Sequence, residues 1–300
     1  MPCPEEPAEA KNPIHNRQSS IVNRQSEEVA VAYIAGIDLG SGATKTVIFD
    51  EDRRVLGRGL TRTRADFDAV AHQSLDQACE QAGLTRDRID YIASTGLGRY
   101  SFDERDIQIT DLTCGARGAH ALFPDAHFVL DMGAQSTRAI ALRDGGKVKA
   151  FRTNEKCAAG SGGFLERVAR YLEVGLEDLG RISLEAANPQ PISSVCAVLA
   201  ESEIINHVSE GKTVPDIIRG AHESLAGRAL SQLKMVGYQG AVVFIGGVGL
   251  QQGMVQACRD TFGDTVHLPD HPSHVVAYGA AILGLQRYHK RRQAAAAGTA

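Results

Sequence analysis

Two kinds of hydrophobic pattern alternate along this chain. Apolar residues run almost unbroken through 31–37, and shorter apolar runs at 89–94 and 241–245 are also typical of buried strands. Between these runs, apolar residues recur every three or four positions, which predicts amphipathic helices. The predicted helices are 66–83, 157–174, 196–209, 215–236 and 273–287. This alternation of strands and helices indicates an α/β protein.

A weak internal repeat relates two parts of the chain. Asp38-Leu-Gly-Ser-Gly-Ala-Thr-Lys aligns with Asp131-Met-Gly-Ala-Gln-Ser-Thr-Arg at an offset of 93 residues, so Asp, Gly, Thr and a basic residue recur in register. A third strand follows in each copy, at Val55 and Val148, and each copy then turns helical. Three strands, helix, strand and helix, occurring twice, predict a duplicated α/β domain with a cleft between its halves. The alternative explanation is that the two segments are unrelated glycine turns that resemble each other by chance.

The repeat also sets the expected boundaries. We place the first half at 31–128 and the second half at 129–272, and we expect the final helix, 273–288, to pack back on the first half. Residues 1–30 are polar and lack periodicity, which predicts a disordered tail, and a second tail is expected at 289–300.

Composition excludes several classes of protein. The 300 residues carry 32 basic and 36 acidic side chains, so no basic face for nucleic acid is expected. The longest apolar run, 29–37, is too short to span a bilayer, so no membrane partner is expected either. The 6 cysteines are scattered without paired spacing, which argues against disulfides and for a cytoplasmic location.

Glycine-rich turns follow three of the predicted strands. In the first turn, Gly40, Ser41 and Gly42 follow Asp38, and the backbone amides of such a turn can hold phosphate oxygens. Lys45 would offset phosphate charge, and Asp38 would hold Mg²⁺ through water.

The second and third turns extend this nucleotide-binding pattern. The second carries Asp131, Gly133 and Gln135 and faces the first by pseudo-symmetry. An uncharged amide such as that of Gln135 can orient an attacking water but cannot deprotonate it. The third places Gly246 and Gly247 after a buried strand, where they would approach an adenine ring. No GxxxxGK[ST] sequence occurs, so the chain is not a P-loop enzyme.

Two cysteines, Cys157 and Cys196, each open a predicted helix. A thiol at a helix start ionises more easily, and a thiolate binds iron or zinc. Because two ligands do not complete a tetrahedral site and a [4Fe–4S] cluster takes four, the pattern indicates a cluster shared between two chains. The alternative is that both cysteines pack as small hydrophobic residues.

The other cysteines and the histidines near the last strand are expected to be structural. We expect buried packing for Cys79, Cys114 and Cys258, and loop or capping roles for His267, His271 and His274.

These motifs resemble the ATPase family of benzoyl-CoA reductases and 2-hydroxyacyl-CoA dehydratase activators, within the superfamily of acetate and sugar kinases, heat-shock ATPases and actin. The resemblance covers about residues 33–288. It implies a duplicated ribonuclease-H-like, actin-like ATPase fold with two βββαβα halves around a nucleotide cleft. Ala134 stands where the family often has Gly, which is expected to stiffen that loop. The positions that match the family's nucleotide motifs are Asp38, Gly40, Ser41, Gly42, Thr44 and Lys45 in the first phosphate loop, Asp131, Gly133 and Gln135 in the second, and Gly246 and Gly247 in the adenosine turn.

The resemblance also implies an activity. Cys157 and Cys196 match residues that ligate a [4Fe–4S] cluster at a subunit interface, with ATP and Mg²⁺ as the other cofactors. Residues 170–228 look most like the smaller, delta-type ATPase subunit of benzoyl-CoA reductases, whose partner is a related but distinct subunit. That subunit hydrolyses ATP and passes low-potential electrons from ferredoxin to catalytic subunits that hold an aromatic acyl-CoA. The alternatives are a homodimeric activator of a 2-hydroxyacyl-CoA dehydratase, a small-molecule kinase of the same fold, and a non-redox ATPase that acts as an interaction module.

Overall fold

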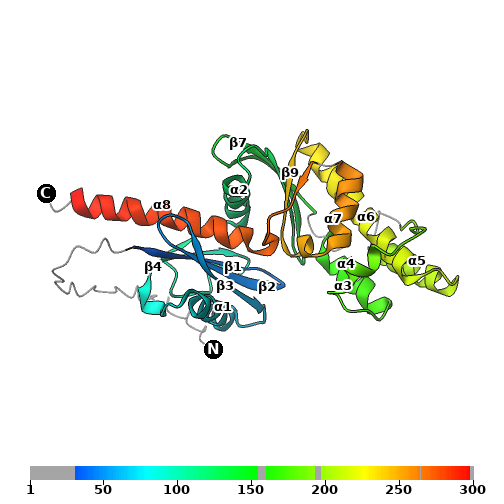
Figure 1. The fold of residues 1–300 in the computed structure, drawn as a ribbon, viewed down its shortest axis with the longest axis horizontal. Helices are drawn as coiled ribbons and strands as arrows, with labels where there is room; N and C mark the ends of the chain where they lie inside the picture. Colours follow the sequence, from blue (N-terminus) through cyan, green and yellow to red (C-terminus); the bar gives the residue numbers. More distant parts are fainter. Residues whose placement is uncertain (1–30, 155–159, 193–196, 264, 298–300) are drawn as a thin grey trace, which may run out of the picture. The chain divides into compact units, whose positions relative to one another are not determined.

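The computed structural model describes residues 31–154, 160–192, 197–263 and 265–297, which contain two five-stranded mixed sheets (Figure 1). The first sheet has the order β3-β2-β1-β4-β5 and consists of β1 (Tyr33–Leu39), β2 (Ala43–Phe49), β3 (Val55–Arg62), β4 (Ile89–Gly96) and β5 (Ile107–Gln108). The second sheet has the order β10-β9-β6-β7-β8 and consists of β6 (Phe128–Met132), β7 (Thr137–Arg143), β8 (Lys147–Thr153), β9 (Val242–Ile245) and β10 (Val266–His267).

Helices fill the connections between these strands. The α-helices are α1 (Phe67–Ala82), α2 (Asp111–Leu122), α3 (Gly162–Tyr171), α4 (Leu179–Ser183), α5 (Ala197–Ser209), α6 (Val214–Met235), α7 (Gln252–Phe262) and α8 (Val275–Ala297). Short 3₁₀ turns are η1 (Arg86–Arg88), η3 (Gly247–Leu250) and η4 (Pro272–His274).

Side-chain caps explain where several helices begin and end. Asp66 accepts a hydrogen bond from the backbone amide of Ala69 and starts α1, while Gly83, with φ of 65°, ends it. Thr213 caps α6 in the same way, and a proline occupies its first turn, where a missing amide donor costs nothing. The sequence signals at these termini therefore act as expected.

The internal repeat is visible as matching strand register. In the first sheet β1 pairs antiparallel with β2, which places Asp38 opposite Lys45. In the second sheet β6 pairs antiparallel with β7, which places Asp131 opposite Arg138. The parallel neighbours, β4 and β9, lie on the other side of β1 and β6. The structure is thus a duplicated ribonuclease-H-like fold, as the sequence predicts.

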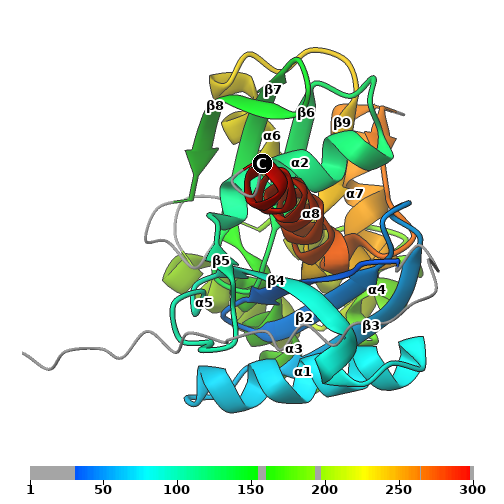
Figure 2. The same ribbon diagram turned by 90° about the vertical axis from the view of Figure 1, so that its left-hand side faces the viewer.

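Each central strand is buried on both faces because helices cover both sides of its sheet. In β1, Ile37 and Leu39 pack against α1, whereas Ile34 packs against α8. In β6, Leu130 belongs to the core cluster that includes buried residues of α3 to α7, whereas Val129 belongs to the cluster that includes α2 and α8. Viewed along its axis, α8 lies between the two sheets (Figure 2). The helix at the C-terminal end of the chain therefore contacts both halves.

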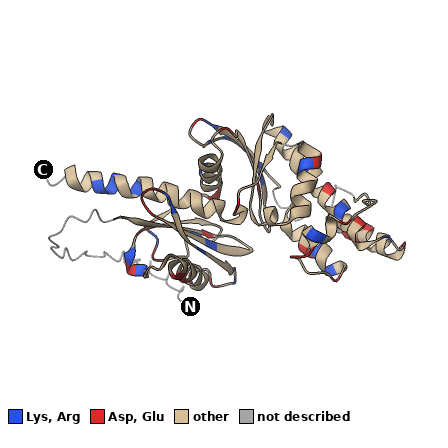
Figure 3. Cartoon of the chain, viewed as in Figure 1, with Lys and Arg blue, Asp and Glu red and all other residues tan. Residues whose placement is uncertain are grey.

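The predicted C-terminal tail is wrong over most of its length. Helix α8 continues to Ala297, so residues 289–297 are helical, because Lys, Arg, Gln and Ala fill nearly all of this stretch and all have high helix propensity. The outer part of α8 carries Lys and Arg, whereas the helices α3 to α7 carry charges of both signs (Figure 3). The predicted tail 1–30 and residues 298–300 lie outside the described residues. Every helix in the described part of the chain is too short or too polar to cross a membrane.

Candidate functional site

The first acidic loop joins β1 to β2. The Nζ of Lys45 lies 3.2 Å from Oδ2 of Asp38, whose residue is only 6% exposed. Behind the loop, the hydroxyl of Thr63 donates to the carbonyl of Gly40 at 2.7 Å and lies 3.0 Å from the hydroxyl of Thr44. Thr44 thus supports the loop from behind and does not reach the cleft. Gly96, with φ of 87°, ends β4 against Asp38, where an added Cβ would lie 2.6 Å from Oδ1 of that residue.

The second acidic loop joins β6 to β7 and holds a three-membered charge cluster. Arg138 donates to Asp131 at 3.0 Å and to Asp111, at the start of α2, at 2.6 Å. Burial raises the pKa of the Asp131 carboxyl, and the charge of Arg138 opposes that rise. Burial alone would lower the pKa of Arg138, but the carboxylates of Asp131 and Asp111 raise it above its ordinary value. The guanidinium therefore stays charged between two acids.

The backbone of this second loop is tied to the start of α3. The amide of Gly162 donates to the carbonyl of Gly133 at 2.9 Å, and the amide of Gly163 donates to that of Ala134 at 2.7 Å. The hydroxyl of Ser161 also donates to Ala134, at 3.1 Å. Any shift of the loop must therefore move the beginning of α3 with it.

A cavity of about 650 Å³ lies between the two loops. A volume in this range suits a small-molecule or cofactor site. The predicted site residues that line it are Asp38, Gly40, Ser41, Gly42, Lys45, Asp131, Gly133, Ala134, Gln135, Gly246 and Gly247. The loops also touch each other, because a Cβ added at Gly42 would lie 2.7 Å from the Cβ of Ala134.

The third glycine turn follows β9 at the same cavity. Gly246 has φ of 96°, and a Cβ there would lie 2.3 Å from the carbonyl oxygen of Met132, so only glycine fits. Its amide donates to the carbonyl of Pro272 at 2.9 Å. Nearby apolar lining comes from Leu165, Leu176, Val248 and Leu250, which together can cover a flat ring.

A buried histidine braces this apolar part of the cavity. His222 is fully buried in α6, and its ring contacts the hydroxyl of Ser183 at 2.8 Å and Oε1 of Gln251 at 3.1 Å. Burial lowers the pKa of His222 to about 4, so the ring is neutral at pH 7. Gln251 lines the cavity and donates to the carbonyl of Leu176 at 3.2 Å. The side-chain amide is therefore held at both ends.

Sequence reasoning missed several lining residues. Arg138 was visible as the counterpart of Lys45 in the repeat, but its second partner, Asp111, lies 27 positions away in the chain. Arg99 and Glu166 also line the cavity, and no motif in the sequence marks them.

The predicted metal ligands Cys157 and Cys196 lie outside the described residues. The other cysteines of the described part are buried, as expected. Burial raises the pKa of the Cys114 thiol to about 12 and also raises the pKa values of Cys79 and Cys258, so none of these fits a thiolate ligand. Among the described residues, no group of three His, Cys, Asp or Glu side chains is arranged to hold a metal.

The fold and its cleft define an actin-like ATPase architecture. A ROK family glucokinase from Streptomyces griseus shares the fold, with a TM-score of 0.55 at 16% identity over 85% of this chain and 100% of that one. The chain belongs to the BadF/BadG/BcrA/BcrD ATPase family, whose sequence model matches residues 35–284.

Relatives within the family are similar over nearly their whole length. A subunit of benzoyl-CoA reductase from Thauera aromatica is 39% identical, over 85% of this chain and 94% of the relative. The activator of lactoyl-CoA dehydratase from Anaerotignum propionicum is 36% identical, over 86% and 100%. The activator of the 2-hydroxyisocaproyl-CoA dehydratase from Clostridium difficile, solved with bound ADPNP, has a TM-score of 0.83 at 34% identity, over 87% and 97%.

Proposed function

We propose that the chain binds ATP with Mg²⁺ in the cleft between its halves and hydrolyses it. The observation that carries this proposal is the pair of pseudo-symmetric acidic loops that face one cavity of about 650 Å³. Asp38 and Asp131 would hold the hydrated Mg²⁺, and Lys45 would offset phosphate charge. The backbone amides of Gly40 to Gly42 and of Gly133 and Ala134 would hold phosphate oxygens.

Gln135 is assigned to position the attacking water. Its residue is exposed to the cavity, and it lies in the second phosphate loop beside Asp131. Attack on the γ-phosphorus breaks the bond to the β–γ bridging oxygen and releases ADP and phosphate. Gly246 and Gly247 would lie against the adenosine, beside the apolar lining of Leu176 and Leu250.

Two substitutions test the ATP site. Replacing Asp38 or Asp131 by Asn removes a magnesium-binding charge but keeps the shape, so hydrolysis should fall on the order of 10³-fold. Steady-state ATPase assays with circular dichroism as a fold check provide the measurement. The matched control is Asp144→Asn, in the turn between β7 and β8 and away from the cavity. Normal turnover in both site variants would disprove the assignment.

We further propose that Cys157 and Cys196 supply half of a [4Fe–4S] cluster and that a partner chain supplies the other half. When bound, the cluster carries one electron at low potential. Support comes from the described residues on each side of the two segments. Asn154 and Gly160, which bracket 155–159, both bond to Thr137, just after the second phosphate loop. The carboxylate of Glu201 in α5 pairs with Arg167 of α3 at 2.7 Å.

These contacts would provide a route from the nucleotide to the proposed cluster. The second phosphate loop is bonded to the start of α3, and α3 is ion-paired to α5, whose first residue follows Cys196. A conformational change of this loop on hydrolysis would therefore shift both segments that carry the cysteines. The protein's means of changing a cluster potential are solvent exposure and hydrogen bonds to its sulfurs.

The client that we favour is a benzoyl-CoA reductase, in which this ATPase subunit passes electrons from ferredoxin to the catalytic subunits beside a related ATPase subunit. Support comes from the 39% identity to the benzoyl-CoA reductase subunit of Thauera aromatica. A homodimeric activator of a 2-hydroxyacyl-CoA dehydratase is the second candidate, favoured by the TM-score of 0.83 to such an activator. Anaerobic co-purification separates them: a reductase partner gives a heteromer that dearomatises a thioester, whereas an activator purifies as a homodimer.

The cluster is tested by iron analysis of anaerobically purified protein. We expect about four irons per two ATPase chains, as four thiolates per cluster require. Cys157→Ser or Cys196→Ser should remove the iron and weaken the dimer while nucleotide binding persists. Cys114→Ala is the matched control and should keep the iron. Iron-free, colourless and fully active protein would contradict the redox function and favour a kinase of the same fold.

A further inference from the structure

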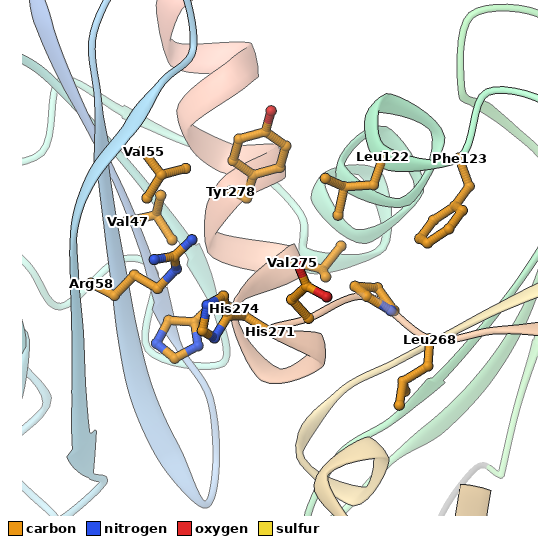
Figure 4. Close-up of a pocket in the computed structure, with 12 residues that line it drawn as sticks. Val47, Val55, Arg58, Leu122, Phe123, Leu268, His271, His274, Val275 and Tyr278 are labelled. Atoms are coloured by element: carbon orange, nitrogen blue, oxygen red, sulfur yellow. The ribbon is translucent and has the colours of Figure 1, made fainter.

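A second cavity, of about 340 Å³, lies beside the nucleotide cleft, and Figure 4 shows the residues that line it. Both halves contribute to it. The lining residues come from β2 and β3, from the end of α2, from the segment after β10, and from η4 and α8. No step of the proposed ATPase function uses this cavity.

One end of the cavity is polar. Arg58 projects inward from β3, and the rings of His271 and His274 lie beside it (Figure 4). The guanidinium of Arg58 makes no ion pair within 4.0 Å among the described residues. Burial lowers the pKa of Arg58, and the charge of Asp270, which also lines the cavity, partly offsets that effect. This end therefore presents a partly desolvated cation without a close counter-ion.

His274 forms part of the cavity surface and joins η4 to β3, but it contributes no charge to the cavity. Its Nε2 lies 3.3 Å from the carbonyl oxygen of Gly59, to which it donates, and its Nδ1 lies 3.1 Å from the hydroxyl of Ser273. Burial lowers the pKa of His274 to about 4, and the charges of Lys45 and Arg58 act in the same direction. The ring is therefore neutral at pH 7, and Arg58 supplies the charge of this end.

The other end of the cavity is apolar. Val47 and Val55 form one side and Leu122 lies across from them, with Tyr278 and Val275 of α8 between (Figure 4). A ligand that matches both ends needs an anionic head and an apolar body. The volume lies at the lower end of the range for small-molecule sites, which favours a small ligand.

We propose that this cavity binds a small monocarboxylate with an aromatic or branched apolar body, with its carboxylate on Arg58. Guanidinium groups bind carboxylates through two parallel hydrogen bonds, and an apolar pocket adds affinity in proportion to the area covered. The inference extends beyond the proposed ATPase function, and the binding step does not depend on it.

The position of the cavity makes the ligand a regulator of the nucleotide site. Lys45 lines the cleft and Val47, two residues along β2, lines the second cavity. In the same way Ser273 and Val276 line the cleft, whereas His274 and Val275 line the second cavity. A ligand that favours one arrangement of β2 and of residues 273–276, which both cavities share, changes nucleotide affinity, and nucleotide must change ligand affinity by the same factor.

Titration calorimetry on the full chain without nucleotide tests the binding. The probes are benzoate and cyclohexanecarboxylate, with benzyl alcohol as the uncharged counterpart. We expect saturable binding of both acids and at least about tenfold weaker binding of the alcohol. Arg58→Gln should weaken benzoate binding at least about tenfold, whereas Arg62→Gln, four residues along β3 and outside the cavity, should not change it.

Two further variants keep the test decisive if Arg58→Gln fails to fold. Asp270→Asn removes the opposing charge from an exposed position and should tighten benzoate binding several-fold. Leu122→Glu, at a residue 43% exposed, should abolish binding. Benzoate binding that is absent, or is unchanged in all three cavity variants, would overturn the proposal. ADP affinity measured with and without benzoate tests the regulation separately: equal values would overturn the coupling, and they would do so whether or not ATP is hydrolysed.

Discussion

The two acidic loops of this protein share one backbone plan and differ in their electrostatics. In both, an aspartate near the end of the central strand lies opposite a basic residue, and a glycine with positive φ closes against the aspartate from the parallel neighbour. In the first loop, Asp38 has Lys45 as its basic partner, at 3.2 Å. In the second, Arg138 is shared between Asp131 and Asp111.

This difference in partners makes the ammonium of Lys45 free to move and fixes the guanidinium of Arg138 in place. A lysine ammonium is a compact charge on a flexible stem and can turn from Asp38 toward a bound phosphate. A guanidinium that donates to two carboxylates is fixed in place and neutralises both. We infer that duplication supplied the same scaffold twice, and that Lys45 then serves the nucleotide while Arg138 holds the second loop together.

Replacing each basic residue by Met is expected to give the largest contrast. Arg138→Met leaves two carboxylates close together without their shared counter-charge, so the free energy of unfolding should fall by about 3 kcal/mol or more. Lys45→Met leaves a single carboxylate, that of Asp38, without its partner and should cost less, about 1 kcal/mol, while ATP hydrolysis falls sharply. Urea denaturation and ATPase assays on both variants provide the measurement. Equal stability losses would refute the division of roles.

The glycines that close against the two aspartates, Gly96 and Gly246, should respond alike to substitution, with a smaller loss of stability than Arg138→Met gives. Gly96→Ala and Gly246→Ala each force an alanine into a positive φ and into backbone contact, at 2.6 Å from the carbonyl oxygen of Leu39 and 2.3 Å from that of Met132. We expect each to lower the free energy of unfolding by about 2 kcal/mol. Gly247→Ala is the control, because nothing lies within 4 Å of its added Cβ, and it should change stability by less than about 1 kcal/mol. A tolerated Gly246→Ala would show that the turn can relax.

Much of this fold could be predicted from the sequence, because periodicity and repeats are local signals. The offset between Asp38 and Asp131 identified the duplication, and the capping residue of α1 marked its start. The end of α8 was missed, because an alanine-rich stretch without apolar periodicity is typical of low-complexity tails as well as of helices.

Contacts between distant parts of the chain could not be predicted in the same way. The bond from Arg138 to Asp111 and the support of Gln251 by His222 join residues on different elements, and a single sequence carries no record of such pairs. The cavity beside Arg58 was also missed, because its lining comes from both halves of the chain. His274 illustrates the limit: a loop role was expected, but its partner, the carbonyl of Gly59, lies 215 positions away.

The smallest predicted effect concerns the point where the two loops meet. The Cβ of Ala134 occupies the space that a side chain at position 42 would need, so Gly42 accommodates the alanine of the opposite loop. Ala134→Gly removes that contact and frees the backbone of the second loop, which should lower the free energy of unfolding by about 1 kcal/mol or less. The bonds from Ser161 and Gly163 to the carbonyl of residue 134 do not involve the methyl group and should persist.

Nucleotide binding should report the same change more clearly than stability does. A looser second loop must be ordered when phosphate binds, so ADP affinity measured by calorimetry should fall by a factor of a few, with a more unfavourable binding entropy. Gly42→Ala is the complementary variant, because its methyl would clash with Ala134 at 2.7 Å and hold the loops apart. The double variant with Gly42→Ala and Ala134→Gly should recover part of the lost affinity, since it moves the methyl from one loop to the other. Losses that simply add in the double variant would show that the two loops do not act through this contact.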